Sequence, residues 1–463
     1  MLNSVVAQFV IALVVAMVVL PLLAFSLVAL LQVSGRTPKD KTLAGLARLT
    51  FTCASLAGLV AGGLYVLRGG TPLRVAFGHW FSLGEPDGRH YGFDVAVLID
   101  GVSLVYLSLT AILCGTVGAF SLRYMQNERG AGGFLQLLLL FTASMSLLTV
   151  AESLDLLFVG WELVGITSAL LIAFYRDRSG PVRHGLLAFA IYRVCDGALL
   201  TALIVLHHAT GSSSLPTEVS IAGGGSATLF GILILVASLG KSAQWPFSSW
   251  LPRAMEGPTP SSAIMYGALS IHAGAYLLLR TAPLWESSSA VRVAVVAIGL
   301  VSAALGSLVG RAQTDAKSSL AYAAIVQVGL IYMEIGFGWQ RLALMHVAGH
   351  AILRTFEFLR APSLIADHQV LESQLGNAAP RTGALYERML PKKVRESLYV
   401  LALERGYADA VAARFFGSAR RILLAFDRFD ERTARLFDPA DVVCRSETPP
   451  SIVAPAKLEE SIR

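Results

Sequence analysis

The chain has 463 residues, of which 55% are hydrophobic and only 15% are charged. A soluble globular protein carries about 25% charged residues, so this composition excludes the class of soluble enzymes. The net charge of +6 comes from basic residues in short loops rather than in one patch, which argues against a nucleic-acid partner. The four scattered cysteines contain no CxxC pair and provide neither a disulfide framework nor a metal site.

Apolar runs of about 20 residues, the length that crosses a bilayer, recur through the first three quarters of the chain. We therefore predict an all-α polytopic membrane protein with eleven transmembrane helices. The first run is too long for a cleavable signal peptide and predicts a span. The predicted spans cover residues 4–32, 42–67, 97–121, 133–151, 154–175, 183–207, 226–252, 260–283, 290–310, 314–336 and 339–361.

The loops between these spans predict the orientation. Lysine and arginine gather in alternate loops, whereas the loop after the sixth span, GSSSLPTEVSIAGGGSAT, contains neither. Because basic loops stay on the cytoplasmic side, we expect the N-terminus outside and the C-terminus in the cytoplasm of a cell (inner) membrane. The main exception to this rule is the external segment between the second and third spans, which contains Arg68, Arg74 and Arg89. This segment alternates around EPDG, which predicts a short β-hairpin.

The chain divides into three predicted regions: 1–94 with two spans and the hairpin, 95–361 as the core, and 362–463 as a charged cytoplasmic tail. Within the tail, residues 394–416 and 418–437 show helical spacing with one apolar face. Two interpretations remain open for these amphipathic helices. They lie on the membrane surface, or they dock against a partner.

Ionisable groups inside a span are costly and usually functional. Glu162 lies near the middle of the fifth span and indicates a carboxylate that exchanges a proton or pairs with a lysine. Asp196 lies in the middle of the sixth span, where a local pair with Arg193, one turn earlier, is the alternative interpretation. Asp315 and Lys317, near the start of the tenth span, belong either to the proton path or to a pair at the membrane surface.

Lys241 follows an apolar run and precedes Pro246 by five residues. Proline has no backbone N–H, so the seventh helix is expected to break there. Unwound backbone inside a membrane lines cavities and marks the ion sites of transporters. We therefore predict that Lys241 gains and loses a proton at a helix break.

Three basic side chains share one face of the eleventh span, since His346, His350 and Arg354 are spaced i, i+4 and i+8. We predict a hydrated proton relay on this face. A zinc site is the alternative, because His-x3-His binds zinc on a helix, but no third ligand is evident. Glu357, three residues beyond Arg354, is expected to pair with it. His272, in the eighth span, is either a packed core histidine or a relay member.

Four blocks carry a family resemblance. GKSAQWPFSSWLPRAMEGPTPSSA resembles the characteristic motif of the proton-conducting antiporter-like subunits, a family that includes large membrane subunits of respiratory complex I, Mrp antiporters and membrane-bound hydrogenases. FVGWELVGITSALLI, YRVCDGALL and QTDAKSSLAYAAIVQVG resemble other blocks of the family in the same order, so that the likeness covers roughly residues 95–365.

This resemblance implies roles for individual residues. Glu162 and Lys241 match the lysine–carboxylate pair of the first half-channel, and Asp196 matches the carboxylate of the neighbouring span. Lys317, His346 and His350 match positions of the central relay.

The chain also departs from the family pattern. Tyr266 stands where the family usually has a histidine, and Arg354 stands where a lysine is usual. Arginine does not release its proton readily, so the relay is altered there. The second half-channel needs a further broken helix after the eleventh span, for which we expect no room in this chain.

The segment LRTFEFLRAPSLIADH and the polar tail that follows resemble the membrane subunit of the DAB-type inorganic-carbon system. That resemblance implies a proton-conducting subunit, not itself an enzyme, which couples the proton motive force to CO2 or bicarbonate uptake. The partner is then a large cytoplasmic carbonic-anhydrase-like subunit that holds zinc, with no cofactor in this chain. The alternatives are a proton-pumping subunit of a redox complex of the complex I or hydrogenase type, and a standalone Na+/H+ antiporter.

Overall fold

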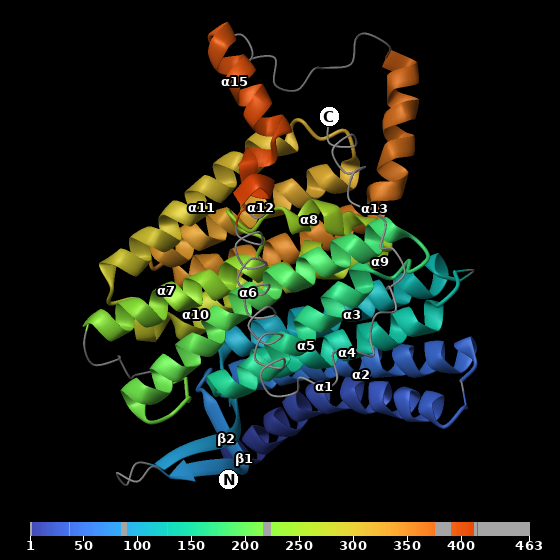
Figure 1. The fold of residues 1–463 in the computed structure, drawn as a ribbon. Helices are drawn as coiled ribbons and strands as arrows, with labels where there is room; N and C mark the ends of the chain where they lie inside the picture. The colour runs from blue at the N-terminus through green and yellow to red at the C-terminus, as the bar shows by residue number, and fades with distance from the viewer. Residues whose placement is uncertain are drawn as a thin grey trace, which may run out of the picture. The chain divides into compact units, whose positions relative to one another are not determined.

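The computed structural model describes residues 2–36, 38–84, 90–126, 128–215, 224–375, 390–411 and 414. Long helices dominate them (Figure 1), and all the contacts below lie in the compact unit Met1–Ala408. The helices are α1 Leu2–Val33, α2 Asp40–Leu67, α3 Gly101–Tyr124, α4 Ala131–Val150, α5 Leu154–Ile172, α6 Ser179–Thr210, α7 Gly224–Lys241, α8 Trp250–Arg253, α9 Thr259–Ser261, α10 Ala273–Trp285, α11 Ser289–Gly310, α12 Ala316–Gly336, α13 Gln340–Leu375 and α15 Lys392–Leu403, with short 3-10 helices at Ala254–Glu256 (η1), Ser270–His272 (η3) and Arg405–Tyr407 (η5) and a π-helix at Ser262–Ala268 (η2).

The membrane-spanning character predicted from the sequence is confirmed. Within the described ranges, nine stretches are long and apolar enough to cross a membrane. The apolar helix α7 is shorter than these nine stretches, and α13 is not among them, although both helices occupy predicted spans. The chain is thus a polytopic helical membrane protein, while the number of eleven spans stays a prediction.

The predicted hairpin is present. Strands β1 (Leu73–Gly84) and β2 (His90–Ile99) pair antiparallel, from Leu73 opposite Ile99 to Gly84 opposite His90. The EPDG tip lies outside the described residues. The backbone N–H of Glu152 donates to the carbonyl of Ala96 at 3.1 Å, so the hairpin joins the connection between α4 and α5.

Helix α7 ends at Lys241, which confirms the predicted break, but the cause differs from the expected one. The N–H groups of Ala243 and Gln244 donate to the carbonyls of Gly240 and Leu239 at 3.4 and 3.1 Å. Ala243 has a φ of +48°, so these bonds form the left-handed cap that ends many helices. The helix therefore stops before Pro246. In a continued helix the N–H of residue 246 would donate to the carbonyl of Ser242, but proline has no N–H. The side chain of Gln244 donates to this carbonyl instead, at 2.9 Å.

The segment Thr259–Trp285 lies at the centre of the bundle. Every residue in it except Pro283 is buried, and its neighbours include α3, α7, α12 and α13. Its backbone passes from the π-helix η2 through the 3-10 helix η3 before α10 begins at Ala273. The sequence did not predict this second irregular segment. Non-helical backbone at membrane depth is tolerated where protein surrounds it, as it does here.

The predicted tail is described only in part. Helix α13 continues to Leu375, beyond the expected end of the last span at residue 361, and α15 falls in the first predicted amphipathic stretch. Helix α15 packs on α11 of the same chain, with Ala402 buried and Gly406 approaching Leu305. The second amphipathic stretch, 418–437, lies outside the described residues, and the domain boundaries at 94 and 361 stay predictions.

Candidate functional site

Lys241 is fully buried at the end of α7. Its Nζ atom lies 4.5 Å from the centre of the Tyr192 ring and 5.0 Å from that of Trp161, which is the geometry of cation–π contacts. Within the described part of the chain, Nζ has no hydrogen-bond partner. Gly165 of α5 leaves the space, because a Cβ atom there would lie 2.8 Å from Nζ. The helices α5, α6 and α7 thus enclose one amino group.

Two carboxylates share one guanidinium beside this lysine. Arg193 of α6 donates from Nη1 to Glu162 of α5 and from Nη2 to Asp196, the second contact being 2.7 Å long. The indole N–H of Trp161 donates to the other oxygen of Asp196. The local Asp196–Arg193 pair that the sequence left open is therefore real, and it extends to Glu162. We call Glu162, Arg193 and Asp196 the carboxylate cluster.

The direct pair expected between Glu162 and Lys241 is not what the structure shows. Glu162 bonds to Arg193, whose position three residues before Asp196 on α6 lets it bridge both carboxylates. Lys241 faces the aromatic rings of Trp161 and Tyr192. Trp161 donates to Asp196, and Tyr192 precedes Arg193 in the chain. Lys241 and the two carboxylates therefore do not form one ion pair. Trp161 links them, because its ring contacts Lys241 and its N–H donates to Asp196.

A row of hydrogen bonds joins the eighth and eleventh predicted spans. Nε2 of His272 lies 2.9 Å from Nδ1 of His350, and Nε of Arg354 donates to Nε2 of His350 at 3.5 Å. Nδ1 of His272 bonds to the carbonyl of Ala268, which only accepts, so this nitrogen carries the proton. Neutral imidazoles then give one direction of donation, from Arg354 to His350 to His272 to Ala268. We call His272, His350 and Arg354 the histidine row.

His346 reaches a different helix. Its Nδ1 lies 2.9 Å from Glu334 Oε1 and its Nε2 lies 3.0 Å from Gln327 Oε1, both on α12. Its ring centre is 6.4 Å from that of His350. The sequence analysis missed Glu334 and Gln327, although a carboxylate at 334 falls inside a predicted span, as Glu162 does. Glu357 pairs with Arg354 at 2.6 Å, as its spacing predicted.

The residues next to Lys241 and His272 meet. Ser242, which follows Lys241, donates from Oγ to the carbonyl of Ile271, which precedes His272, at 2.7 Å. Gly274 permits this approach, because a Cβ atom there would lie 2.3 Å from Ser242 Oγ and 2.7 Å from the hydroxyl of Tyr332. The break in α7 and the irregular turn of the central segment are therefore in direct contact.

Lys317 lies apart from these groups, whereas Tyr266 is linked to Lys241 through the rings of Trp250 and Tyr192. Lys317 is the second residue of α12, ten residues before Gln327, which is about 15 Å of helix. It neighbours Asp315, whose side chain accepts from the backbone of Ser318 at 2.8 Å. Tyr266 is buried in the π-helix and packs edge-on against Trp250 with ring centres 5.5 Å apart. The structure thus brings together Glu162, Asp196 and Lys241, and separately His272, His346, His350 and Arg354.

Across the described ranges, no group of three or more His, Cys, Asp or Glu side chains is placed to hold a metal ion. His346 and His350 point to different partners, a carboxylate on α12 and the imidazole of His272. The two histidines therefore do not converge on one point, and zinc on a partner subunit stays a prediction.

Comparison with known proteins places the chain in a family. The profile described as "NADH:quinone oxidoreductase/Mrp antiporter, TM" matches residues 151–385, just over half of the chain. Chain 5 of the NADH-ubiquinone oxidoreductase of Neurospora crassa is 34% identical over 291 residues, 62% of this chain and 40% of that protein. The probable inorganic carbon transporter subunit DabB1 of Halothiobacillus neapolitanus is 33% identical over 295 residues, 62% of this chain and 51% of that protein.

The fold has a counterpart among solved structures. A chain of the Mrp complex from Dietzia sp. DQ12-45-1b superposes with a TM-score of 0.60 and 24% identity, over 87% of this chain and 43% of that chain. The protein is therefore an antiporter-like polytopic membrane protein. It belongs to the family of membrane subunits shared by NADH:quinone oxidoreductases and Mrp antiporters. The chain spans about half the length of the curated relatives named above.

Proposed function

We propose that this chain conducts protons as the membrane subunit of a larger assembly. The observation that carries the proposal is the burial of Lys241 at a helix end, beside two carboxylates on two other helices. Buried ionisable groups in a span mark ion paths and proton relays. A proton held by Lys241 is close to the carboxylate cluster, and the contact of Ser242 with Ile271 leads to the histidine row.

The histidine row supplies the second part of the path. A proton that binds Nε2 of His350 allows the proton on its Nδ1 to shift to Nε2 of His272, because these two atoms are 2.9 Å apart. Arg354 keeps its own proton and orients His350, since a guanidinium does not deprotonate in proteins. Asp196 and His346 hold the flanking positions, and Lys317 is assigned to the entrance of the path on α12.

We propose further that the assembly couples this proton flow to uptake of CO2 or bicarbonate. The likeness to DabB1 supports this, as does the segment LRTFEFLRAPSLIADH with the polar tail after it. The partner is then a large, cytoplasmic, zinc-containing subunit of the carbonic-anhydrase type. The chain lies in the cell inner membrane with its N-terminus outside and its C-terminus in the cytoplasm, as the basic loops favour.

Replacing Lys241 or Glu162 by Ala tests the proposal. Both variants are expected to abolish accumulation of inorganic carbon by cells, whereas Lys39→Ala, at an exposed residue before α2, leaves it unchanged. Normal accumulation in both variants, with normal amounts of protein in the membrane, contradicts the proposal.

A second candidate function is a proton-pumping subunit of a redox complex, which the identity to chain 5 of the N. crassa oxidoreductase favours. Purification of the complex from detergent-solubilised membranes separates the candidates. A large zinc protein that co-purifies supports inorganic-carbon uptake, and iron–sulfur subunits support the redox complex. Purification of the chain without either supports a standalone Na+/H+ antiporter.

A further inference from the structure

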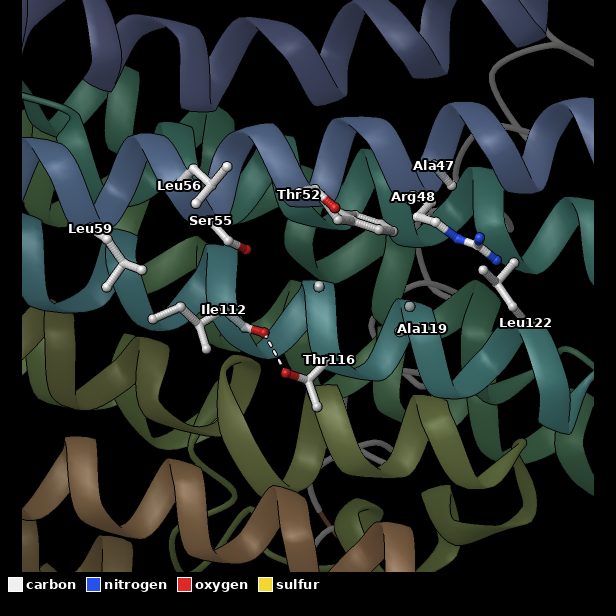
Figure 2. A pocket seen from close by; sticks show the side chains of 13 residues that line it. Ala47, Arg48, Thr52, Ser55, Leu56, Leu59, Ile112, Thr116, Ala119 and Leu122 are labelled. Atoms are coloured by element: carbon white, nitrogen blue, oxygen red, sulfur yellow. Dashed lines mark hydrogen bonds between the residues drawn. The ribbon is translucent and has the colours of Figure 1, made fainter.

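A groove runs along the outside of the bundle between α2 and α3, away from the buried charges. It encloses about 440 Å³ and is lined mainly by apolar side chains, including Leu56, Leu59 and Ile112 (Figure 2). These three side chains are exposed. In a membrane-spanning bundle, exposed apolar side chains face the acyl chains of lipids.

Small residues of α3 form the floor of the groove. A Cβ atom at Gly118 would lie 2.7 Å from the ring of Phe51, and one at Gly115 would lie 3.1 Å from the hydroxyl of Ser55. Two hydroxyl side chains of the groove make hydrogen bonds within the protein. Ser55 donates to the carbonyl of Ala111 at 3.0 Å and Thr116 to that of Ile112 at 2.8 Å. The groove therefore offers an apolar surface with no unmet hydrogen bond from these hydroxyls.

One end of the groove is basic. Figure 2 shows Arg48 at the opposite end from Leu59, next to Leu122. A second cavity of about 750 Å³, lined by Arg48, Arg123 and Tyr124 among others, shares Arg48, Ala119 and Leu122 with the groove. The two cavities thus adjoin each other. Within the described ranges, no carboxylate forms an ion pair with Arg48 or Arg123.

The length of the groove matches one leaflet. From Ile112 to Leu122 the helix α3 rises about 15 Å, which is half of the roughly 30 Å hydrocarbon core. Arg48 lies near the start of its span and Arg123 near the end of its own, so both arginines stand at the same side of the membrane. Two further basic residues, Lys39 and Lys41, lie at the beginning of α2.

We propose that this groove binds one anionic phospholipid, with an acyl chain between α2 and α3 and the phosphate on Arg48 and Arg123. A guanidinium binds phosphate through two parallel hydrogen bonds. Basic pockets between transmembrane helices select anionic headgroups in the same way.

Native mass spectrometry of the full-length protein tests the proposal, with phosphatidylglycerol and phosphatidylcholine of identical acyl chains as probes. The wild type is expected to retain phosphatidylglycerol in preference to phosphatidylcholine. Arg48→Gln and Arg123→Gln should each weaken retention of phosphatidylglycerol about fivefold, since one arginine near the headgroup contributes about this factor. Arg129→Gln, at an exposed arginine that does not line either cavity, is the matched control and should retain phosphatidylglycerol as the wild type does.

Two more variants test the groove itself. Thr116→Trp, at an exposed position on the groove, should fill it and weaken retention of both lipids while Arg48 and Arg123 remain. A photoreactive residue at position 116 should give an adduct with lipid in native membranes. Equal retention of the two lipids by the wild type, wild-type retention by the double arginine variant, or an adduct with another polypeptide at position 116 each overturns the proposal.

Discussion

His272 and His350 meet ring to ring at 2.9 Å between nitrogens, although 78 residues separate them in the chain. The carbonyl of Ala268 fixes the proton of His272 on Nδ1, and Arg354 approaches the far nitrogen of His350. The two imidazoles thus share one proton position between them. This relationship gives the hydrogen bonds of the histidine row one direction of donation. A substitution by a neutral side chain can interrupt these hydrogen bonds without removing a charge.

We predict that His350→Gln lowers proton transfer by about 10²-fold, the usual effect of losing one proton-transferring group. Glutamine keeps a polar side chain at the position but does not pass a proton on at neutral pH. Proton flux into proteoliposomes that contain the purified assembly measures the effect. His208→Gln, at an exposed histidine near the end of α6, is the control and should leave the flux unchanged. A wild-type flux in His350→Gln would remove the histidine row from the path.

Ala243 holds a left-handed backbone with a φ of +48°, a conformation that costs an alanine about 1–2 kcal/mol and a glycine very little. Ala243→Gly should therefore stabilise the protein by about 0.5–1 kcal/mol after the entropy of the unfolded glycine is counted. Ala237→Gly, inside α7, should destabilise it by about 1 kcal/mol. Thermal unfolding in detergent measures both, and a lower midpoint for Ala243→Gly contradicts the assigned role of the cap.

Glu152 lies between α4 and α5, outside the spans, and its side chain is 3% exposed, while Arg74 contacts it at 2.9 Å. Burial raises the pKa of the Glu152 carboxyl, and the Arg74 cation opposes that rise. Arg74→Gln leaves a buried carboxylate without its cation, which should cost about 1–3 kcal/mol at neutral pH. Below the pKa of Glu152 the carboxyl is protonated in both proteins, so the difference in thermal midpoint should vanish as the pH falls.

The double variant decides whether the pair is the cause. In the Glu152→Gln background, Arg74→Gln should have no effect on the thermal midpoint at any pH, because the carboxylate that pairs with Arg74 is absent. A loss of stability that persists at low pH, or in that background, would assign the effect of Arg74 to the hairpin instead.

The fold was largely predictable because its main signal is local. Apolar runs of bilayer length gave the spans, alternation around EPDG gave the hairpin, and a lysine before a proline gave the break in α7. The cause of that break was not predictable from Pro246, because the cap uses Ala243 in a conformation that alanine seldom adopts. The π-helix at Ser262–Ala268 has no local pattern, since contacts with neighbouring helices stabilise it.

The candidate site was predictable only as a set of residue types. The cost of ionisable groups inside a span indicated Glu162, Asp196 and Lys241. The position of Arg193 between the two carboxylates depends on the relative orientation of α5 and α6, which the sequence does not predict. His272 was ambiguous for the same reason, because only the register between the central segment and α13 places it on His350. The roles of these residues in proton conduction stay predictions, of which the variants of Glu162, Lys241 and His350 test three.

The fully enclosed segment Thr259–Trp285 has a consequence for how the protein is made. A helix that offers no surface to acyl chains, and whose backbone changes from α to π and 3-10 hydrogen bonding at η2 and η3, is unfavourable in the bilayer by itself. It acquires its native backbone only once helices on both sides of it in the sequence, α3 and α7 before and α12 and α13 after, have surrounded it. We therefore expect the central segment to fold last, after α12 and α13 have been synthesised, and a chain cut short before α13 to lack the histidine row, because His350 and Arg354 lie on α13.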